Sequence, residues 1–187
     1  VLRVITRLNV GGPSKQILTL NPLFDGREFE QLIVAGRVLD SEMEIDLSSL
    51  GHVTRISALR RGFNPQRDMW SVLQIAKVLR QYKPDIIHTH LSKAWALTIL
   101  AKKLSGANCK VIHTFHGHIL HSYFSNWKAL ILNLVQRFLA SNSDYLVAVN
   151  DITKKELIAA KMGSEEKFVV IYPCLLYTSD AADEEDS

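Results

Sequence analysis

Hydrophobic residues along this chain alternate between short runs rich in β-branched residues and longer stretches with helical spacing. The short runs predict seven buried strands, and the longer stretches predict helices between them. The expected strands are 1–6, 31–35, 53–56, 85–89, 110–114, 145–149 and 168–171. The expected helices are 14–20, 41–50, 65–82, 92–104, 125–140 and 151–162. This alternation predicts an α/β fold, a Rossmann-like parallel sheet with helices on both faces.

Single residues mark where several of these helices begin and end. Pro13 fits a first helical turn, where its missing N–H would have no partner. Ser92 and Asp151 carry side-chain oxygens that are expected to cap the helices they precede. Gly51 and Gly163 are expected to end helices, because glycine accepts a left-handed backbone.

The helix at 65–82 has the clearest periodicity. Its apolar residues recur at intervals of three and four, which places them in one stripe along the helix. The Lys-Pro pair that follows disfavours further helix. The stripe expected to face the core consists of Met69, Val72, Leu73, Ala76 and Leu79.

Composition narrows the class of protein. With 187 residues, 47% of them apolar and 22% charged, the chain suits one well-packed globular domain. No run of about eighteen uncharged apolar residues occurs, so no transmembrane helix is expected. The two cysteines, Cys109 and Cys174, do not make a disulfide framework and indicate a reducing compartment. These features favour a cytoplasmic location.

Charge is unevenly distributed. The net charge is +3, yet the last fourteen residues hold five acidic residues and no basic ones. Without them, 22 basic residues stand against 14 acidic ones, a balance of +8. That balance suits anionic partners such as phosphates or acidic lipid headgroups, and it equally suits an ordinary lysine-rich surface. No motif for binding nucleic acid is present, so no nucleic-acid partner is expected.

The last fourteen residues, CLLYTSDAADEEDS, differ in character from the rest of the chain. CLLYTSDAADE resembles the translated reading frame of a transposase-type sequencing adapter. We therefore expect a natural domain over 1–173 and a non-native addition over 174–187. A genuine acidic, disordered tail is the alternative.

Candidate chemistry is sought just after the strands, because ligands of open parallel sheets bind outside the carboxyl ends of the strands. Gly11 and Gly12 follow the first strand and lead into a helix. Paired glycines allow close approach to an anion, and a helix N-terminus offers free N–H groups and a positive dipole end. The pair therefore predicts a diphosphate site, with a tight turn as the alternative.

Histidines follow two other strands. Six of the seven histidines lie at or just beyond the ends of the strands at 85–89 and 110–114. Imidazole donates or accepts hydrogen bonds and titrates near neutrality, which suits sugar hydroxyls, proton transfer or metal ligation. His113 lies within its strand and is expected to be buried. The other candidates are His88, His90, His116, His118 and His121, with Lys93 nearby.

A metal site is the main alternative for these histidines. The HxxHxH spacing from His113 to His118 resembles a ligand set. However, no Asp or Glu occurs between residues 105 and 125, and Asp85 begins its strand at the opposite end of the sheet. We therefore expect no metal, and a metal-dependent hydrolase is the less favoured interpretation.

The helix at 125–140 is broadly apolar. It carries Trp127, Leu130, Ile131, Leu134, Val135 and Phe138. The favoured interpretation is a helix packed in the core. The alternative is a surface that touches a membrane, which a lipid-linked substrate would make useful.

Four segments together resemble family 4 of the retaining glycosyltransferases. They are VLRVITRLNVGGPSKQ, KPDIIHTHLSKA, KVIHTFHGHILHSYFS and DYLVAVNDITKKEL, and their order matches along nearly all of 1–173. The resemblance implies a GT-B architecture, in which two Rossmann-like domains face each other across a cleft. This chain would be the N-terminal, acceptor-side domain. The donor-binding C-terminal domain would be missing, so the fragment itself would be inactive.

The resemblance also implies roles for residues. Gly12, with Gly11 beside it, matches the loop that approaches the donor diphosphate, and His116 matches the catalytic histidine that faces the reacting sugar. The donor would be a nucleotide sugar, and the acceptor a glycan or a lipid-linked acceptor in bacterial surface polysaccharide synthesis. The family uses no catalytic metal, and no cofactor is implied. A lipid-linked acceptor would bring peripheral contact with the inner face of the plasma membrane.

Two positions depart from the family pattern. Trp95 stands where members often have glycine, and its ring is expected to alter the acceptor side. Asn150 stands where many have serine. Three other functions stay open: a GT-B sugar-nucleotide epimerase, which would want carboxylates near the histidines, a metal-dependent hydrolase, and a stand-alone binding module without catalysis.

Overall fold

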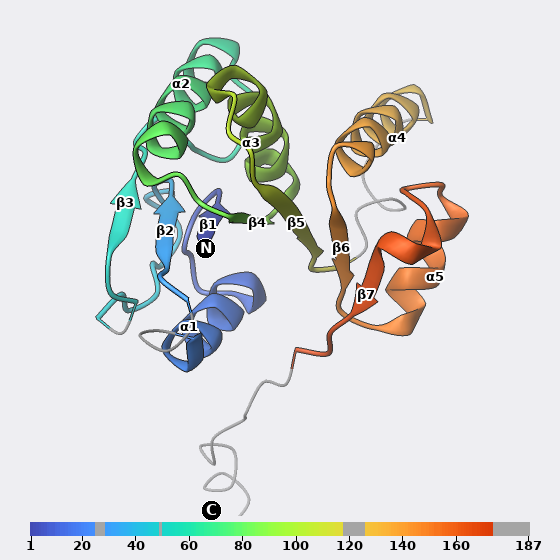
Figure 1. The fold of residues 1–187 in the computed structure, drawn as a ribbon, viewed down its shortest axis with the longest axis horizontal. Coiled ribbons are helices and arrows are strands. Elements are labelled where there is room, and N and C mark those ends of the chain that lie inside the picture. The colour runs from blue at the N-terminus through green and yellow to red at the C-terminus, as the bar shows by residue number, and fades with distance from the viewer. Residues whose placement is uncertain (25–28, 49, 118–125, 174–187) are drawn as a thin grey trace, which may run out of the picture.

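Seven parallel strands form one sheet in the order β3-β2-β1-β4-β5-β6-β7 (Figure 1). The structure is a computed structural model that describes residues 1–24, 29–48, 50–117 and 126–173. The strands are β1 (Leu2–Ile5), β2 (Leu32–Ala35), β3 (Val53–Arg55), β4 (Ile86–His90), β5 (Lys110–Phe115), β6 (Tyr145–Ala148) and β7 (Phe168–Val170). All seven expected strands are therefore confirmed, and each end differs from its expected position by at most one residue.

Within the described residues, five α-helices and one short 3-10 helix connect the strands. They are α1 (Gly12–Phe24), α2 (Pro65–Tyr82), α3 (Ser92–Ser105), α4 (Asn126–Ser141), α5 (Asp151–Ala159) and η1 (Glu165–Lys167). Together with the parallel sheet they confirm the expected Rossmann-like α/β fold.

Side-chain alternation along β1 shows how helices cover the two faces of the sheet. Leu2 and Val4 belong to a buried cluster with residues of α2 and α3. Ile5 points the other way and packs in a second cluster with Ile17 of α1. Figure 1 shows α2 and α3 side by side, with α1 on the other side of the sheet. Helices therefore lie on both faces, as expected.

Helix α2 begins and ends where its sequence signals place it. The side chain of Asn64 accepts a hydrogen bond from the backbone N–H of Arg67, and Pro65 starts the first turn. Lys83 adopts a left-handed backbone with φ of 46° and closes the helix.

The apolar stripe of α2 differs from the one expected. Met69 and Leu73 are exposed, whereas Val72, Ala76 and Leu79 are buried as expected. The buried face is rotated toward Asp68, Ser71 and Ile75, because two polar side chains find partners there. Asp68 pairs with Lys93, and Ser71 donates to the carbonyl of Arg67.

The expected helix at 41–50 does not form, so the prediction that Gly51 ends it is also wrong. Backbone groups of this segment bond to the loop after β1 instead of to one another. Val10 N donates to Met43 O over 2.8 Å, and Ile45 N donates to Leu8 O over 3.0 Å. The segment therefore supports the loop that carries Gly11 and Gly12.

Two expected caps are also wrong. Ser92 is already inside α3, and the cap position is held by Leu91, which makes no side-chain cap bond. Asn150, not Asp151, caps α5, since its Oδ1 accepts from Thr153 N over 2.7 Å. A serine at 150 could make the same bond, so this departure from the family pattern leaves the cap intact.

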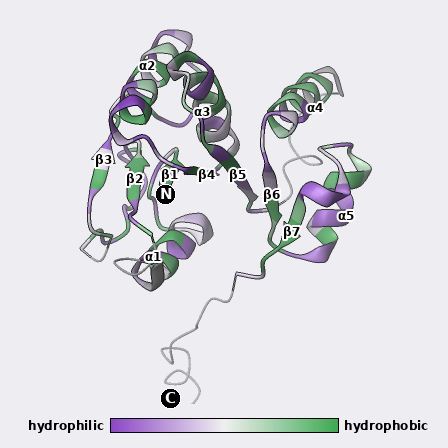
Figure 2. Ribbon diagram, in the orientation of Figure 1, coloured by the Kyte–Doolittle hydropathy of each residue, from purple (hydrophilic) through white to green (hydrophobic). Residues whose placement is uncertain are grey.

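Helix α4 keeps an apolar face in solvent. Leu139 and Ala140 are buried, but five other apolar side chains are between 44% and 60% exposed. They are Leu130, Ile131, Leu134, Val135 and Phe138. The prediction of a core helix is therefore wrong for most of α4, whose hydrophobic residues are visible in Figure 2.

The expected non-native addition, 174–187, lies outside the described residues. Within the described residues, no helix is both long and apolar enough to cross a bilayer.

Candidate functional site

Three loops meet at the carboxyl edge of the sheet, because β1, β4 and β5 are adjacent in it. Ile5 is aligned with His90, and His90 is aligned with Thr114. The loop with Gly11 and Gly12 follows β1, and His116 follows β5 directly. The sequence candidates after these strands are therefore brought to one edge.

Alternation along β4 and β5 divides the histidines between the two faces of the sheet. His88 and His90 share one face with Thr114, and His116 lies beside His90. His113 points to the opposite face, where it meets Thr89. The four clustered histidines that the structure describes thus do not form one group.

His88 is held between a cation and a hydroxyl. Arg3 Nη1 lies 3.3 Å from His88 Nδ1, and Thr114 Oγ1 lies 2.7 Å from Nε2. Because arginine only donates, Nδ1 accepts and Nε2–H donates to Thr114. Burial is the main cause that lowers the pKa of His88 to about 3, and the interactions with Arg3 and His116 act in the same direction. His88 is therefore neutral at pH 7 and engaged on both nitrogens.

His90 and His116 form the central pair. His90 Nδ1 lies 2.9 Å from His116 Nε2, and their ring centroids are 5.2 Å apart. His90 is buried, whereas His116 is only partly buried. Burial holds the pKa of His90 well below its usual value and lowers that of His116 to about 4. The pair is uncharged at pH 7.

His113 belongs to the core, as expected. Its Nδ1 lies 2.9 Å from Thr89 Oγ1, whose proton goes to the carbonyl of Ile112 over 3.2 Å. His113 Nδ1–H is therefore the donor. Trp95 is completely buried and stacks on this ring. The ring of Trp95 therefore fills the core on the face of the sheet opposite to His88 and His90, and it does not line the histidine edge.

Lys93 is engaged away from the histidines. Its Nζ lies 2.6 Å from Asp68 Oδ1 of α2 and also donates to the carbonyl of Gly62. These contacts tie the first turn of α3 to the start of α2. The ammonium group of Lys93 is therefore engaged in holding α3 against α2 and is not directed at the histidines.

The glycine loop is open to a ligand. A Cβ added at Gly12 would meet no atom within 4 Å, and one added at Gly11 would come no closer than 3.8 Å to another residue. Neither glycine has a positive φ, so neither backbone conformation nor packing requires glycine at these positions. Gly12 begins α1, whose first turn holds no acidic residue. This arrangement can receive an anion.

Sequence reasoning missed four residues of this edge. Arg3, Thr89 and Thr114 supply the partners that fix His88 and His113, and only the strand register reveals that they are neighbours. Leu91 follows His90 with a φ of 69°, which is strained for a non-glycine residue. Its turn starts α3 immediately after the strand.

His118 and His121 fall outside the described residues. Among the residues that the structure describes, no three His, Cys, Asp or Glu side chains are grouped so that they could hold a metal ion.

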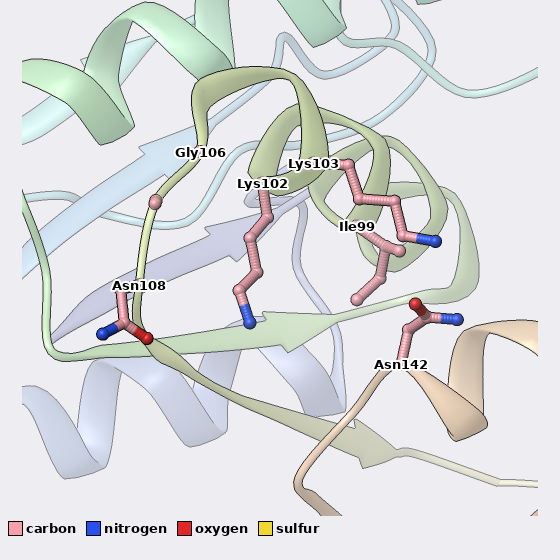
Figure 3. Close-up of a pocket in the computed structure, with 7 residues that line it drawn as sticks. Ile99, Lys102, Lys103, Gly106, Asn108 and Asn142 are labelled. Carbon is pink, nitrogen blue, oxygen red and sulfur yellow. The ribbon is translucent and has the colours of Figure 1, made fainter.

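A hollow of about 350 Å³ lies away from this edge (Figure 3). Lys102 and Lys103 from the end of α3 line it, together with Asn108 before β5 and Asn142 after α4. These residues lie at the amino end of β5, a strand's length away from His116. The hollow is therefore separate from the histidine site.

Comparison with known proteins gives a consistent picture. The Glycosyltransferase Family 4 profile matches residues 10–175. The chain is 31% identical over 116 residues to the UDP-Gal:alpha-D-GlcNAc-diphosphoundecaprenol alpha-1,3-galactosyltransferase of Escherichia coli. That alignment covers 62% of this chain and 30% of the relative.

Solved structures share the fold at low identity. The apo lipopolysaccharide outer core galactosyltransferase WaaB superposes with a TM-score of 0.69 at 16% identity, over 91% of this chain and 45% of that one. A UDP-GlcNAc 2-epimerase from Methanocaldococcus jannaschii gives 0.61 at 20% identity, over 91% and 44%. The chain thus spans less than half the length of these proteins. Because transferases and epimerases share this fold, the fold alone does not assign the family. The family match does: the chain belongs to Glycosyltransferase Family 4.

Proposed function

We propose that the protein containing this chain transfers a sugar from a nucleoside-diphosphate sugar to a hydroxyl of a glycan or lipid-linked acceptor in surface polysaccharide synthesis. Residues 1–173 would form its N-terminal, acceptor-side domain. The family match over 10–175 carries this proposal. The name of the Escherichia coli relative supports it, because that enzyme uses UDP-galactose and a diphosphoundecaprenol-linked acceptor.

Gly11 and Gly12 would bind the donor diphosphate. As the bond to the sugar breaks, the leaving diphosphate gathers negative charge. Backbone N–H groups and the dipole of α1 would stabilise that charge because they are already oriented before reaction. The open space at both glycine Cα atoms supports this role, since a phosphate can approach the backbone there.

His116 would hold an oxygen of the reacting sugar. Its pKa of about 4 keeps the ring neutral at pH 7, so it would act through a hydrogen bond and not through positive charge. Its partly exposed ring lies at the carboxyl edge of the sheet, where ligands of such folds bind. Retention of configuration stays an expectation from the family resemblance.

The test is the replacement His116→Ala in an enzyme form of the relatives' length, assayed with UDP-sugars and a lipid-linked acceptor. Losing one preorganised donor should lower kcat by about a hundredfold. The matched control is His52→Ala, because His52 is exposed on the far side of β2 from the site strands. Near-normal turnover by His116→Ala, or conversion of a UDP-sugar to its epimer without acceptor, would contradict the proposal.

The reaction would need no metal or cofactor besides the donor. The histidine segment from 105 to 125 lacks any carboxylate that could complete a ligand set. Transfer should therefore continue in EDTA at an unchanged rate. Loss of transfer in EDTA, with recovery on adding Mg²⁺ or Zn²⁺, would overturn this part of the proposal.

The exposed face of α4 would rest on the cytoplasmic surface of the plasma membrane. Leu130, Ile131 and Leu134 share this face with Val135 and Phe138. An apolar helix face beside basic side chains suits an interfacial position. Lys103 supplies one such cation, with its Nζ 4.6 Å from the Phe138 ring. Contact of this kind would bring the histidine edge near a lipid-linked acceptor.

Binding to vesicles tests the membrane contact. The chain should sediment with vesicles of phosphatidylglycerol and phosphatidylethanolamine. A Leu130→Gln, Leu134→Gln double variant should bind at least about tenfold more weakly, given the apolar area it removes. Ile152→Gln, which changes an exposed apolar residue of α5, is the control. Equal binding by all three chains would rule out α4 as the contact.

A further inference from the structure

The hydrogen bond between His90 and His116 can have either polarity. The atoms joined are His90 Nδ1 and His116 Nε2, 2.9 Å apart. Both rings are neutral at pH 7, so each carries one N–H, and one ring must donate while the other accepts. If His90 donates, His116 keeps its proton on Nδ1. If His116 donates, its Nδ1 is left as a bare acceptor. The two arrangements present opposite chemistry to a ligand.

The other nitrogen of His90 decides between them. His90 Nε2 is buried and has no hydrogen-bond partner among the described residues. If His116 donated, the single proton of His90 would sit on this Nε2 as an unpaired buried N–H. Orphaned buried N–H groups are rarer in proteins than under-satisfied acceptors. If His90 Nδ1–H donates, His90 Nε2 carries only a lone pair without a partner, and this arrangement is therefore favoured.

The surroundings of His90 exclude the third possibility, a doubly protonated ring. The ring of His88 lies 4.3 Å away and that of His116 lies 5.2 Å away, measured between centroids. Burial is the main cause that opposes a positive His90, and the interactions with His88, His116, Arg3 and His113 act in the same direction. No carboxylate among the described residues is paired with His90.

We propose that His90 is a positioning residue that donates Nδ1–H to His116 Nε2, so that His116 presents Nδ1–H, a hydrogen-bond donor, to an oxygen of its ligand. In this arrangement His116 cannot act as a base, because the lone pair of its Nε2 already accepts the hydrogen bond from His90. The identity of the ligand oxygen rests on the proposed function, but the tautomer does not. The rigid support comes from the strand, because His90 is the last residue of β4 and is fully buried.

Two substitutions separate positioning from mere packing. Asn carries an amide NH₂ near the place of histidine Nδ1, so His90→Asn keeps a donor toward His116. His90→Leu fills similar space and keeps none. If His90 only fills volume, the leucine variant should behave at least as well as the asparagine variant.

The first test is nitrogen-15 NMR of the histidine side chains in this chain at pH 7. We expect His116 to show a protonated Nδ1 and an unprotonated Nε2, with the same tautomer at His90. In His90→Asn the His116 tautomer should persist, and in His90→Leu it should become a mixture. A protonated Nε2 on His116 in the unchanged protein would overturn the proposal.

Kinetics of the enzyme form of the relatives' length give the second readout. His90→Leu should lower kcat by about tenfold with KM for the donor nearly unchanged, because a transition-state contact is misdirected. His90→Asn should recover most of kcat. Equal losses in both variants would contradict positioning. If His116→Ala keeps normal turnover while the tautomer is as expected, the proposed function fails and the inference about His90 stands.

Discussion

The indole of Trp95 lies flat on the imidazole of His113, with ring centroids 3.9 Å apart and planes 5° from parallel. Trp95 Nε1 also donates to Ser143 Oγ over 2.9 Å, and that hydroxyl donates to the carbonyl of Leu139 over 3.0 Å. Phe115 meets both rings edge-on. One buried side chain of α3 therefore joins β5 to the end of α4.

Replacing this indole should destabilise the fold without touching the candidate site. Trp95→Phe removes the hydrogen bond to Ser143 and leaves a small void, which should lower the free energy of unfolding by about 2 to 3 kcal/mol. Urea unfolding followed by far-UV circular dichroism measures the change. Trp70→Phe, at an exposed position of α2, should change it by less than about 0.5 kcal/mol. Equal stability of the two variants would show that the hydrogen bond to Ser143 and the larger ring of Trp95 contribute nothing.

Gly36 is required for packing just after β2. A Cβ there would lie 1.8 Å from the carbonyl oxygen of Leu59 and 2.4 Å from that of Thr6. Both obstacles are backbone atoms that cannot rotate away. Gly36→Ala should therefore fail to fold or unfold at far lower urea concentration. A Gly36→Ala protein with normal stability in urea would mean that the chain crossing at Leu59 is looser than described.

Gly12 should show the opposite behaviour. Because added Cβ atoms meet nothing there, Gly12→Ala should keep its thermal midpoint within a few degrees. In the enzyme form of the relatives' length, however, the methyl group would occupy the space proposed for the diphosphate. KM for the donor should then rise by at least about tenfold, the loss of roughly one good hydrogen bond. An unchanged KM, measured with the donor varied at saturating acceptor, would show that the diphosphate does not bind at this loop.

The strands could be predicted because each is a short buried run bounded by polar or breaking residues, as in β4 and β5. The segment 41–50 misled the prediction, because its local pattern is helical but its backbone partners are in the loop near Val10. Likewise α4 has a core-like pattern and an exposed face. Local periodicity indicates which element a segment can form. Contacts with residues distant in the sequence decide which element forms and which of its faces is buried.

The sequence predicted where in the fold the candidate site lies, but it did not predict which side chains contact one another there. Strand ends indicated where histidines would gather, and His90 and His116 do meet there. The register between β4 and β5 decides which of their side chains share a face of the sheet. The sequence alone therefore could not show that His88 and His113 lie on opposite faces. Lys93 was a candidate because it follows β4, and the sequence does not show that its ammonium group pairs with Asp68 of α2.

Stability should fall as the pH is lowered through the range of histidine titration. The folded-state pKa values of His88, His90, His113 and His116 are all below 6.5, about 3 for His88 and about 4 for His116, chiefly because of burial. The unfolded chain therefore binds more protons than the folded one between about pH 6.5 and the folded values. Each such group lowers stability by about 1.4 kcal/mol per pH unit across that window.

The stabilising contribution of these neutral histidines is thus fully present above pH 6.5 and is lost as the pH falls toward 4. Four groups acting together would remove most of an ordinary domain's stability, about 5 to 15 kcal/mol, by about pH 5. Urea midpoints at pH 7.5, 6.5, 5.5 and 5.0 measure this slope. His113→Phe keeps an aromatic ring against Trp95 but cannot titrate, so its midpoint should depend less steeply on pH. A midpoint that is the same at pH 5.0 and 7.5 would mean that these imidazoles take up protons in the folded protein as readily as in the unfolded one.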